Sequence, residues 1–272
     1  MISKEFAFTY HLSLITYHLL QMRRFYAPPQ NFNAGKITLE VEETKHLRDV
    51  LRLSAGARVR VFDGAGKEFL CAVETIEKHR TLLKILDEIA PSAPESNLNL
   101  TLAVALLKGE KFDFVVQKAV ELGASKIVPL ITKRGDVKIR DASDAAKKLE
   151  RWRRIALEAA KQSGRAKLLE IDALINFNDL IKNSASLRLC GKSLILFAES
   201  GGESFESISH KAERVSEIVA VIGAEGGWET SEIEAARASN FQIITFAGRI
   251  LRAETAAIAV AAVLQNRFGD FN

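Results

Sequence analysis

The sequence predicts an α/β protein in which a mostly parallel sheet follows a small, mostly antiparallel β domain. Short β-like runs dominate before the Pro-Ser-Ala-Pro stretch Pro91–Pro94, and strands alternate with helices after it. Strand–helix alternation is typical of a parallel sheet, and a proline-rich stretch is typical of a linker. The 47% hydrophobic and 26% charged content excludes disordered and membrane-embedded chains.

The part before the linker contains four β-like runs and one helix. The runs are Lys36–Val41, Ala57–Phe62, Phe69–Ile76 and Leu82–Asp87. Between two of them, Asp63-Gly64-Ala65-Gly66 has the composition of a hairpin turn. The stretch Glu43–Leu53 carries apolar residues at helical spacing and predicts a helix. Together these elements predict a small barrel or sheet of about 70 residues.

The part after the linker alternates between strands and helices. We expect helices over Glu110–Leu122, Ala142–Ser163, Ser231–Ser239 and Ala253–Asn266. Gly123 ends the first of these, as glycine commonly does after a helix. The expected strands are Leu98–Leu106, Lys126–Ile131, Leu194–Phe197, Ile218–Ile222 and Gln242–Phe246.

Residues 1–21 are interpreted as a leader or as a start-site artefact, and we favour the artefact, with Met22 as the true start. Their apolar stretch Leu12–Leu20 is interrupted by polar residues, and neither a strong basic region nor a cleavage site flanks it. These features argue against a signal peptide. No run approaches the roughly 20 apolar residues of a membrane span, so we expect a cytoplasmic protein without a membrane partner.

Cysteine and histidine content argues against a metal centre. Cys71 and Cys190 stand alone, and the five histidines have no ligand spacing, so we expect no metal. The formal charge is only +4, but Lys133–Lys167 holds twelve Lys/Arg against five Asp/Glu. Such a cluster is either a phosphate-binding surface or simply a solvated helix face.

Three expected strands of the second part run into loops of unusual composition. These loops are Ala198–Gly202, Gly223–Trp228 and Ala247–Arg252. In an open parallel sheet, ligands bind outside the carboxyl ends of the strands, and glycine lets backbone groups approach them closely. The sequence therefore predicts a small-molecule pocket lined largely by backbone. Neither a P-loop nor a G-x-G-x-x-G fingerprint is present in its required context, which argues against a nucleotide triphosphate or dinucleotide.

The segment Arg249–Ala256 places charges at the start of an apolar helix, Ala256–Val263, that we expect to be buried. Charges there are costly unless they are paired or face a polar site. Two interpretations remain open at this point. Arg252 and Glu254 form a salt bridge while Thr255 caps the helix, or Arg252 faces a substrate and Glu254 positions it.

These motifs together resemble the RsmE-type 16S rRNA uridine-N3 methyltransferases of the SPOUT superfamily. The resemblance covers nearly the whole chain from Met22 on. It rests on Arg23–Tyr26, His46–Arg52, Lys108–Lys111, Gln117–Gly123, Glu158–Arg165, Ile222–Gly227 and Arg249–Ala256. The sequence departs from the family at Ala224, where proline is usual, and at Phe246-Ala247, where Leu-Gly is common.

The resemblance implies a PUA-like RNA-binding barrel at 22–90 and a SPOUT methyltransferase domain with a C-terminal trefoil knot at 95–272. It also implies a homodimer and S-adenosylmethionine as the cofactor. The matching cofactor-binding residues are Glu199, Ile222, Gly223, Glu225, Gly226, Gly227, Phe246, Ala247, Ile250 and Leu251.

The implied reaction is methylation of uridine N3 in 16S rRNA, within the small ribosomal subunit. Loss of the N3 proton leaves an anion that an arginine can stabilise, and we assign Arg252 to this role with Glu254 orienting it. The proton acceptor is unassigned. Another RNA such as tRNA, or a non-catalytic role in ribosome assembly, remains an alternative. The RNA-binding candidates are Arg23, Arg24, Lys108, Arg134, Arg153 and Arg165.

Overall fold

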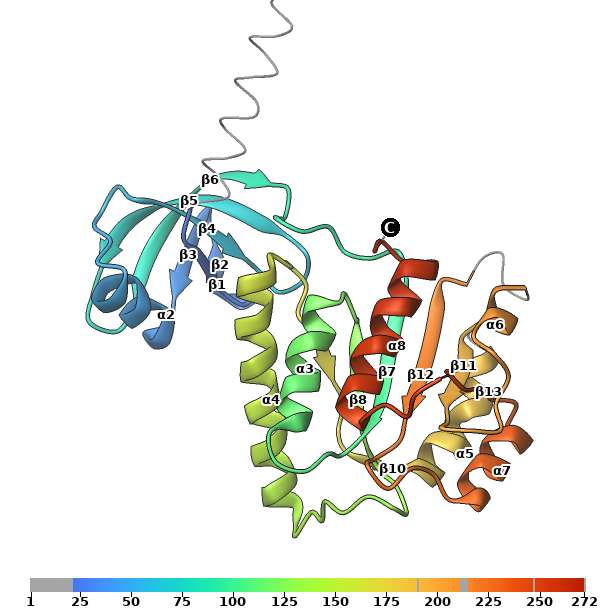
Figure 1. Ribbon diagram of the computed structural model, residues 1–272. Helices are drawn as coiled ribbons and strands as arrows, with labels where there is room; N and C mark the ends of the chain where they lie inside the picture. Colours follow the sequence, from blue (N-terminus) through green and yellow to red (C-terminus); the bar gives the residue numbers. More distant parts are fainter. Residues whose placement is uncertain (1–21, 190, 211–214, 247, 272) are drawn as a thin grey trace, which may run out of the picture. The chain divides into compact units, whose positions relative to one another are not determined.

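The computed structural model describes residues 22–189, 191–210, 215–246 and 248–271 (Figure 1). The expected leader at 1–21 lies outside the described residues, as do Cys190 and Ala247. The chain divides into two compact units. The N-terminal unit comprises the described chain up to Glu95 together with Gly164–Leu168, and the C-terminal unit comprises Ser96–Ser163 and the chain from Leu169 on.

The N-terminal unit is built on a six-stranded sheet in the order β1-β4-β5-β6-β3-β2. The β1–β4 pair is parallel and the other pairs are antiparallel, as the sequence predicts for most of this unit. Its strands are β1 (Arg24–Tyr26), β2 (Phe32–Asn33), β3 (Lys36–Leu39), β4 (Arg58–Phe62), β5 (Glu68–Ile76) and β6 (Thr81–Ile89). Its helical segments are η1 (Pro29–Asn31), α2 (Val41–Lys45) and η2 (His46–Val50).

Two expectations for this unit need correction. The strand expected over Lys36–Val41 ends at Leu39, because α2 already begins at Val41. The expected helix Glu43–Leu53 is shorter: α2 passes into the π-helical turn η2, which ends at Val50. Arg52 then adopts a φ of 52°, a left-handed conformation that a helix cannot continue through.

The hairpin turn predicted at Asp63–Gly66 is present between β4 and β5. The Asp63 carboxylate accepts hydrogen bonds from the backbone N–H groups of Ala65 and Lys67, at 2.7 and 3.0 Å. Gly64 and Gly66 adopt φ values of 77° and 114°, which residues with a Cβ rarely reach. Aspartate and glycine therefore have different roles in this turn. The aspartate accepts hydrogen bonds from backbone N–H groups, and the glycines allow the chain to reverse direction.

A buried ion network lies beside this hairpin. The fully buried Glu68 carboxylate binds Arg24 Nε at 2.9 Å and Arg60 Nε at 3.0 Å. Arg24 also stacks on the Phe62 ring, 4.0 Å from its centroid, and donates to the Arg165 carbonyl at 2.8 Å. Arg165 itself pairs with Glu95 at 2.6 Å. Buried charges need such partners, because removing one partner of a buried pair is strongly destabilising.

The segment Gly164–Leu168 returns to the N-terminal unit after 68 residues of the C-terminal unit have intervened. Backbone hydrogen bonds fix it in place: the Gly66 N–H donates to the Ala166 carbonyl and the Leu168 N–H donates to the Gly64 carbonyl. The N-terminal unit is therefore assembled from two separate stretches of the chain, which the sequence does not predict.

Cys71 should be inert towards thiol reagents in the folded protein. Its side chain is fully buried, and burial raises the pKa of its thiol from 9.0 to about 12. Because the unfolded thiol ionises first, the free energy of unfolding should fall as the pH rises above 9 towards 12. The measurement is labelling of a Cys190→Ser variant with Ellman's reagent at pH 8, with urea-unfolded protein as the positive control. Rapid labelling without urea contradicts the burial.

The C-terminal unit is built on a parallel sheet in the order β10-β8-β7-β12-β11-β13, with β9 paired to β8. The strands are β7 (Asn99–Ala105), β8 (Lys126–Ile131), β9 (Glu170–Ile171), β10 (Ile175–Asn176), β11 (Ser193–Phe197), β12 (Glu217–Ile222) and β13 (Gln242–Ile244). The helices are α3 (Lys111–Glu121), α4 (Ala142–Ser163), α5 (Phe177–Leu189), α6 (Glu206–His210), α7 (Thr230–Ala238) and α8 (Ala253–Phe268). The predicted parallel sheet is confirmed, although β13 ends at Ile244 instead of Phe246.

Helices cover both faces of this sheet. Leu194 and Leu196 of β11 and Val219 and Val221 of β12 form one core with α5 and α7. Alternate residues point to the opposite face, where α3 and α8 lie side by side in Figure 1. The expectation that α8 is buried all round is wrong in part. Val260, Ala261 and Leu264 are buried, but a second apolar stripe is only half-buried, and it comprises Ile258, Ala259, Ala262 and Val263.

Candidate functional site

The three unusual loops follow neighbouring strands and meet at one edge of the sheet. Strand β11 lies between β12 and β13, and all three run in parallel. Their carboxyl ends, at Phe197, Ile222 and Ile244, therefore point the same way. Each loop begins at one of these ends, so that three segments distant in sequence can line a single cavity.

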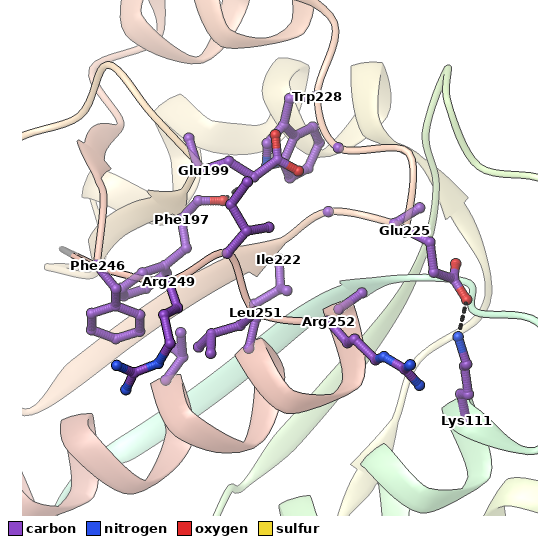
Figure 2. A pocket seen from close by; sticks show the side chains of 18 of the residues that line it. Lys111, Phe197, Glu199, Ile222, Glu225, Trp228, Phe246, Arg249, Leu251 and Arg252 are labelled. Carbon is purple, nitrogen blue, oxygen red and sulfur yellow. Dashed lines mark hydrogen bonds and ion pairs between the residues drawn. The ribbon is translucent and has the colours of Figure 1, made fainter.

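A cavity of about 440 Å³ lies at this edge, between the three loops and the start of α8. Figure 2 shows side chains from β11, β12 and the segment before α8 around it. The volume is within the usual range for small-molecule sites. Its lining comprises Lys111, Phe197, Ala198, Glu199, Ile222, Gly223, Ala224, Glu225, Gly227, Trp228, Phe246, Gly248, Arg249, Ile250, Leu251, Arg252, Ala253, Ala256 and Val260.

Hydrogen bonds between the loops fix the shape of the cavity. The Trp228 indole N–H donates to the Phe197 carbonyl at 2.9 Å, which ties the β12 loop to the end of β11. The Ala198 N–H donates to the Ile244 carbonyl at 2.9 Å, which ties the β11 loop to β13. The aromatic ring of Phe197 also contacts that of Phe246, with centroids 5.3 Å apart. The backbone groups that face the cavity are therefore held in place by their neighbours.

The glycines of the β12 loop allow close packing that side chains would prevent. A Cβ on Gly226 would lie 2.7 Å from the carbonyl oxygen of Arg134, and one on Gly223 would lie 3.0 Å from the Trp228 ring. Gly227 has a φ of 68°, and a Cβ there would overlap the Glu199 carboxylate. The loop therefore approaches Arg134 and Glu199 only because these positions lack side chains.

Replacing Gly227 with alanine should weaken binding of the expected cofactor at least about tenfold. The left-handed φ costs alanine roughly 1–2 kcal/mol of stability. The loss of affinity is expected because the added methyl group must displace the Glu199 carboxylate from the cavity wall. Calorimetric titration with S-adenosylmethionine measures the loss.

Gly56→Ala is the matched control for the Gly227 substitution. Gly56 also has a positive φ, 85°, but a Cβ there meets nothing within 4 Å and lies in the N-terminal unit. It should lower stability by a similar amount and leave affinity unchanged. Equal affinities for the two variants would contradict a role for the Gly227–Glu199 contact.

A cluster of charges occupies one side of the cavity. Lys111 Nζ lies 3.0 Å from Glu225 Oε1 and 3.7 Å from Glu254 Oε2 (Figure 2 shows the first pair). Partial burial raises the pKa of the Glu225 carboxyl. Hydrogen bonds from its own backbone, from Lys111 and from the Lys108 N–H outweigh this effect and lower the pKa below its usual value. Glu225 is therefore a carboxylate at neutral pH and a poor proton acceptor.

Arg252 and Glu254 are not paired with one another. Arg252 is the exposed residue that immediately precedes α8. It lines the cavity, and its guanidinium has no hydrogen bond or ion pair to any described residue. Glu254 faces Lys111 instead, and its Oε2 is buried without a hydrogen-bond partner in the described chain. The expected Arg252–Glu254 salt bridge and the expected orienting of Arg252 by Glu254 are therefore both unsupported, and no side chain caps α8.

Most residues expected to bind the cofactor line this cavity. They are Glu199, Ile222, Gly223, Glu225, Gly227, Phe246, Ile250 and Leu251. Gly226 lies in the same loop but packs against Arg134, outside the lining. Ala247 is outside the described residues.

The expected RNA-binding residues fall into two groups. Arg23, Lys108, Arg134 and Arg153 are exposed. Lys108 pairs with Asp136 at 2.7 Å, and Arg134 lies against the β12 loop. In contrast, the side chains of Arg24 and Arg165 are only 9% and 5% exposed and belong to the ion network of the N-terminal unit. The structure uses these two arginines to hold the unit together, which the sequence pattern did not indicate.

The larger side chains of the lining that were not predicted as site residues include Lys111, Phe197, Trp228 and Arg249. Three of them could have been predicted as site residues from the sequence, because Phe197 ends a predicted strand and Trp228 and Arg249 lie in two of the loops. Lys111 comes from a different part of the chain, and only the fold brings it to the cavity.

Neither a membrane span nor a metal site is found in the described part of the chain. None of its helices is both long and apolar enough to cross a bilayer. No three histidine, cysteine, aspartate or glutamate side chains among the described residues gather closely enough to hold a metal ion.

Comparison with known proteins gives concordant matches over most of the chain. Residues 94–265 match the RNA methyltransferase domain family, and residues 39–86 match the RNA methyltransferase PUA domain family. A curated relative from Synechocystis, named ribosomal RNA small subunit methyltransferase E, is 32% identical over 86% of this chain and 74% of its own length.

Two solved structures are similar in fold. A ribosomal RNA small subunit methyltransferase E from Neisseria gonorrhoeae, bound to S-adenosyl methionine, has a TM-score of 0.81 and 34% identity, covering 93% of this chain and 100% of that one. A putative methyltransferase from Legionella pneumophila, in complex with the same cofactor, has a TM-score of 0.81 and 29% identity, covering 92% and 99%.

Proposed function

Because the chain belongs to the family of RNA methyltransferases that includes ribosomal RNA small subunit methyltransferase E, we propose that it transfers a methyl group from S-adenosylmethionine to N3 of a uridine in 16S rRNA. The family agrees with the one that the sequence motifs resemble. The observation that carries the proposal is the glycine-lined cavity at the ends of β11, β12 and β13, since its lining suits this cofactor.

The chemistry of the cavity lining suits S-adenosylmethionine. The cofactor carries a sulfonium and an ammonium group but no phosphate. Two carboxylates, Glu199 and Glu225, line the cavity and suit those positive groups and the ribose hydroxyls. Apolar walls from Ile222, Phe246 and Leu251 suit the adenine ring, whose edge can bond to exposed backbone groups of the loops.

When bound, the cofactor supplies an electrophilic methyl group on its sulfonium. The protein must then present uridine N3 in line with that methyl and stabilise the charge that appears on O2 and O4 when the N3 proton leaves. Arg252 is suited to this role, because it lines the cavity and no described residue occupies its guanidinium. The target base must leave its stack to reach the cavity.

We propose exposed cations in each unit, taken separately, as RNA contacts. Lys108 and Arg134 lie beside the β12 loop, and Arg153 is exposed on α4 without a partner among the described residues. Arg23 is exposed in the N-terminal unit, which we propose to be an RNA-binding PUA-like domain. Arg24 and Arg165 are left out because their guanidinium groups are buried.

We further propose the trefoil knot and the homodimer that the sequence resemblance implies. The knot is supported by the path of the chain: β13 lies beside β11 at the edge of the sheet, yet α8, which follows it, packs against β12 and β7. The dimer is supported by the half-buried apolar stripe of α8 and by Ile250, which is 84% exposed beside the cavity. Sedimentation of the purified protein tests the dimer.

The experiment that tests the function has two stages. Calorimetry first measures S-adenosylmethionine binding, and the absence of binding overturns the methyltransferase proposal in favour of a non-catalytic assembly factor. The protein is then incubated with the cofactor and with small ribosomal subunits or tRNA from a strain that lacks the enzyme. Mass mapping should find one N3-methylated uridine in 16S rRNA, whereas methylation of tRNA alone would reassign the substrate.

A further inference from the structure

Lys111 occupies a position at which a positive charge is electrostatically unfavourable. It is the first residue of α3, where the helix dipole is positive and an acidic residue would be preferred. Two carboxylates, Glu225 and Glu254, offset this by facing its ammonium group from the β12 loop and from α8. Three segments far apart in sequence therefore converge to hold one lysine at the cavity wall.

The charges on this side of the cavity balance only when Lys111 is included. Lys111 and Arg252 supply two positive charges against the carboxylates of Glu225 and Glu254. Figure 2 shows Arg252 on the same side of the cavity as the Lys111–Glu225 pair. Without Lys111, two carboxylates would face one guanidinium, and the site would repel an anionic base.

Lys111 is also free to donate to a ligand. Its ammonium has three N–H donors, and the structure uses one in a hydrogen bond to Glu225, while Glu254 lies at the longer distance of 3.7 Å. Its side chain is 37% exposed, so a donor can face the cavity without breaking the Glu225 contact.

We propose that Lys111 is a second catalytic residue, whose ammonium donates a hydrogen bond to a uridine carbonyl oxygen while Arg252 binds the other, with Glu225 and Glu254 as its positioning residues. This inference rests on the proposed function. In the reaction the N3–H bond breaks and its proton passes to solvent water. N3 then forms a bond to the methyl carbon as the sulfonium–methyl bond breaks, and that bonding pair stays on sulfur.

Lys111→Met should slow methylation on the order of 10²-fold, as loss of one donor to a developing anion does, and leave S-adenosylmethionine affinity within a few-fold. The deficit should shrink as the pH rises, because uridine then loses its proton unaided. It should also shrink on RNA containing 5-fluorouridine, whose N3–H is more acidic. Lys118→Met is the matched control, since Lys118 lies on the same helix but pairs with Glu121 at 2.6 Å.

A double variant separates catalysis from simple charge repulsion. Glu254 also faces Lys111 but is not part of the cavity lining, so its replacement removes one carboxylate without removing a cofactor contact. If Lys111 only neutralises carboxylates, Lys111→Met combined with Glu254→Gln should regain activity; if Lys111 donates to the base, the double variant stays slow. Full activity of Lys111→Met, or a deficit that is the same at every pH and with 5-fluorouridine, overturns the proposal. Failure of the unmodified protein to methylate 16S rRNA instead overturns the proposed function, and this inference with it.

Discussion

Arg252→Ala should slow methyl transfer by about 10²–10³-fold, the usual effect of removing a donor that faces charge developing in a transition state. Arg252 lines the cavity, and its guanidinium has no competing ion pair within the described chain, so it is available to a substrate oxygen. Since Glu254 faces Lys111 instead of Arg252, the substitution breaks no internal salt bridge. Single-turnover methylation with saturating RNA measures the effect on the chemical step.

The control for this substitution is an arginine at the other end of α8, the helix that Arg252 precedes. Arg267 is in the last turn of α8, is exposed and is remote from the cavity lining, so Arg267→Ala should remain active. Cofactor affinity should stay within a few-fold for both variants. A rise in the cofactor dissociation constant large enough to account for the whole Arg252→Ala deficit would mean that Arg252 binds the cofactor and not the base.

Glu68→Gln should lower the free energy of unfolding by about 3–5 kcal/mol, the typical cost of removing one partner of a buried ion pair. Glu68 is fully buried and is the shared partner of Arg24 and Arg60, whose side chains are 9% and 5% exposed. Burial lowers the pKa of the Arg60 guanidinium, yet an arginine does not lose its proton in a protein. Glutamine would therefore remove the negative charge that these two buried cations share.

The same substitution on the same strand provides the comparison. Glu74 of β5 pairs with Lys36, but both side chains are well exposed, at 37% and 46%. Glu74→Gln should cost less than about 1 kcal/mol because solvent screens such a pair. Urea unfolding of the two variants measures both values, and equal destabilisation would show that burial of the Glu68 network contributes nothing.

Long, strongly patterned elements were predictable from the sequence. Lys126–Ile131 and Ala142–Ser163 have the predicted bounds, because one is a continuous apolar run and the other a long amphipathic helix. Helix α5 was missed, since Asn178, Asn183 and Ser184 favour turns over helices. Its helical state depends on tertiary packing, in which Phe177 and Leu180 enter the core beneath β11 and β12.

The candidate site was predictable where it depends on loops that follow strands. Two observations were enough to predict most of the cavity lining: the glycine-rich composition of Gly223–Gly227, and the tendency of ligands to bind at the carboxyl ends of parallel strands. The partners of charged side chains were not predictable. The sequence analysis expected Glu254 to interact with its neighbour Arg252. In the structure Glu254 instead pairs with Lys111, some 140 positions earlier in the chain. Arg24 and Arg165 have the composition of an RNA-binding surface but are buried.

The return of Gly164–Leu168 to the N-terminal unit sets an order of events during synthesis. Arg24 and the carbonyl that it binds are 141 residues apart in the chain. At the usual rate of about 5–20 residues per second, the ribosome needs on the order of 10 s to make that stretch. Until Arg165 has been synthesised, Arg24 cannot donate its hydrogen bond to the Arg165 carbonyl. The N-terminal unit therefore cannot finish folding when Glu95 has been made, but must wait until 68 residues of the C-terminal unit and the segment Gly164–Leu168 have followed.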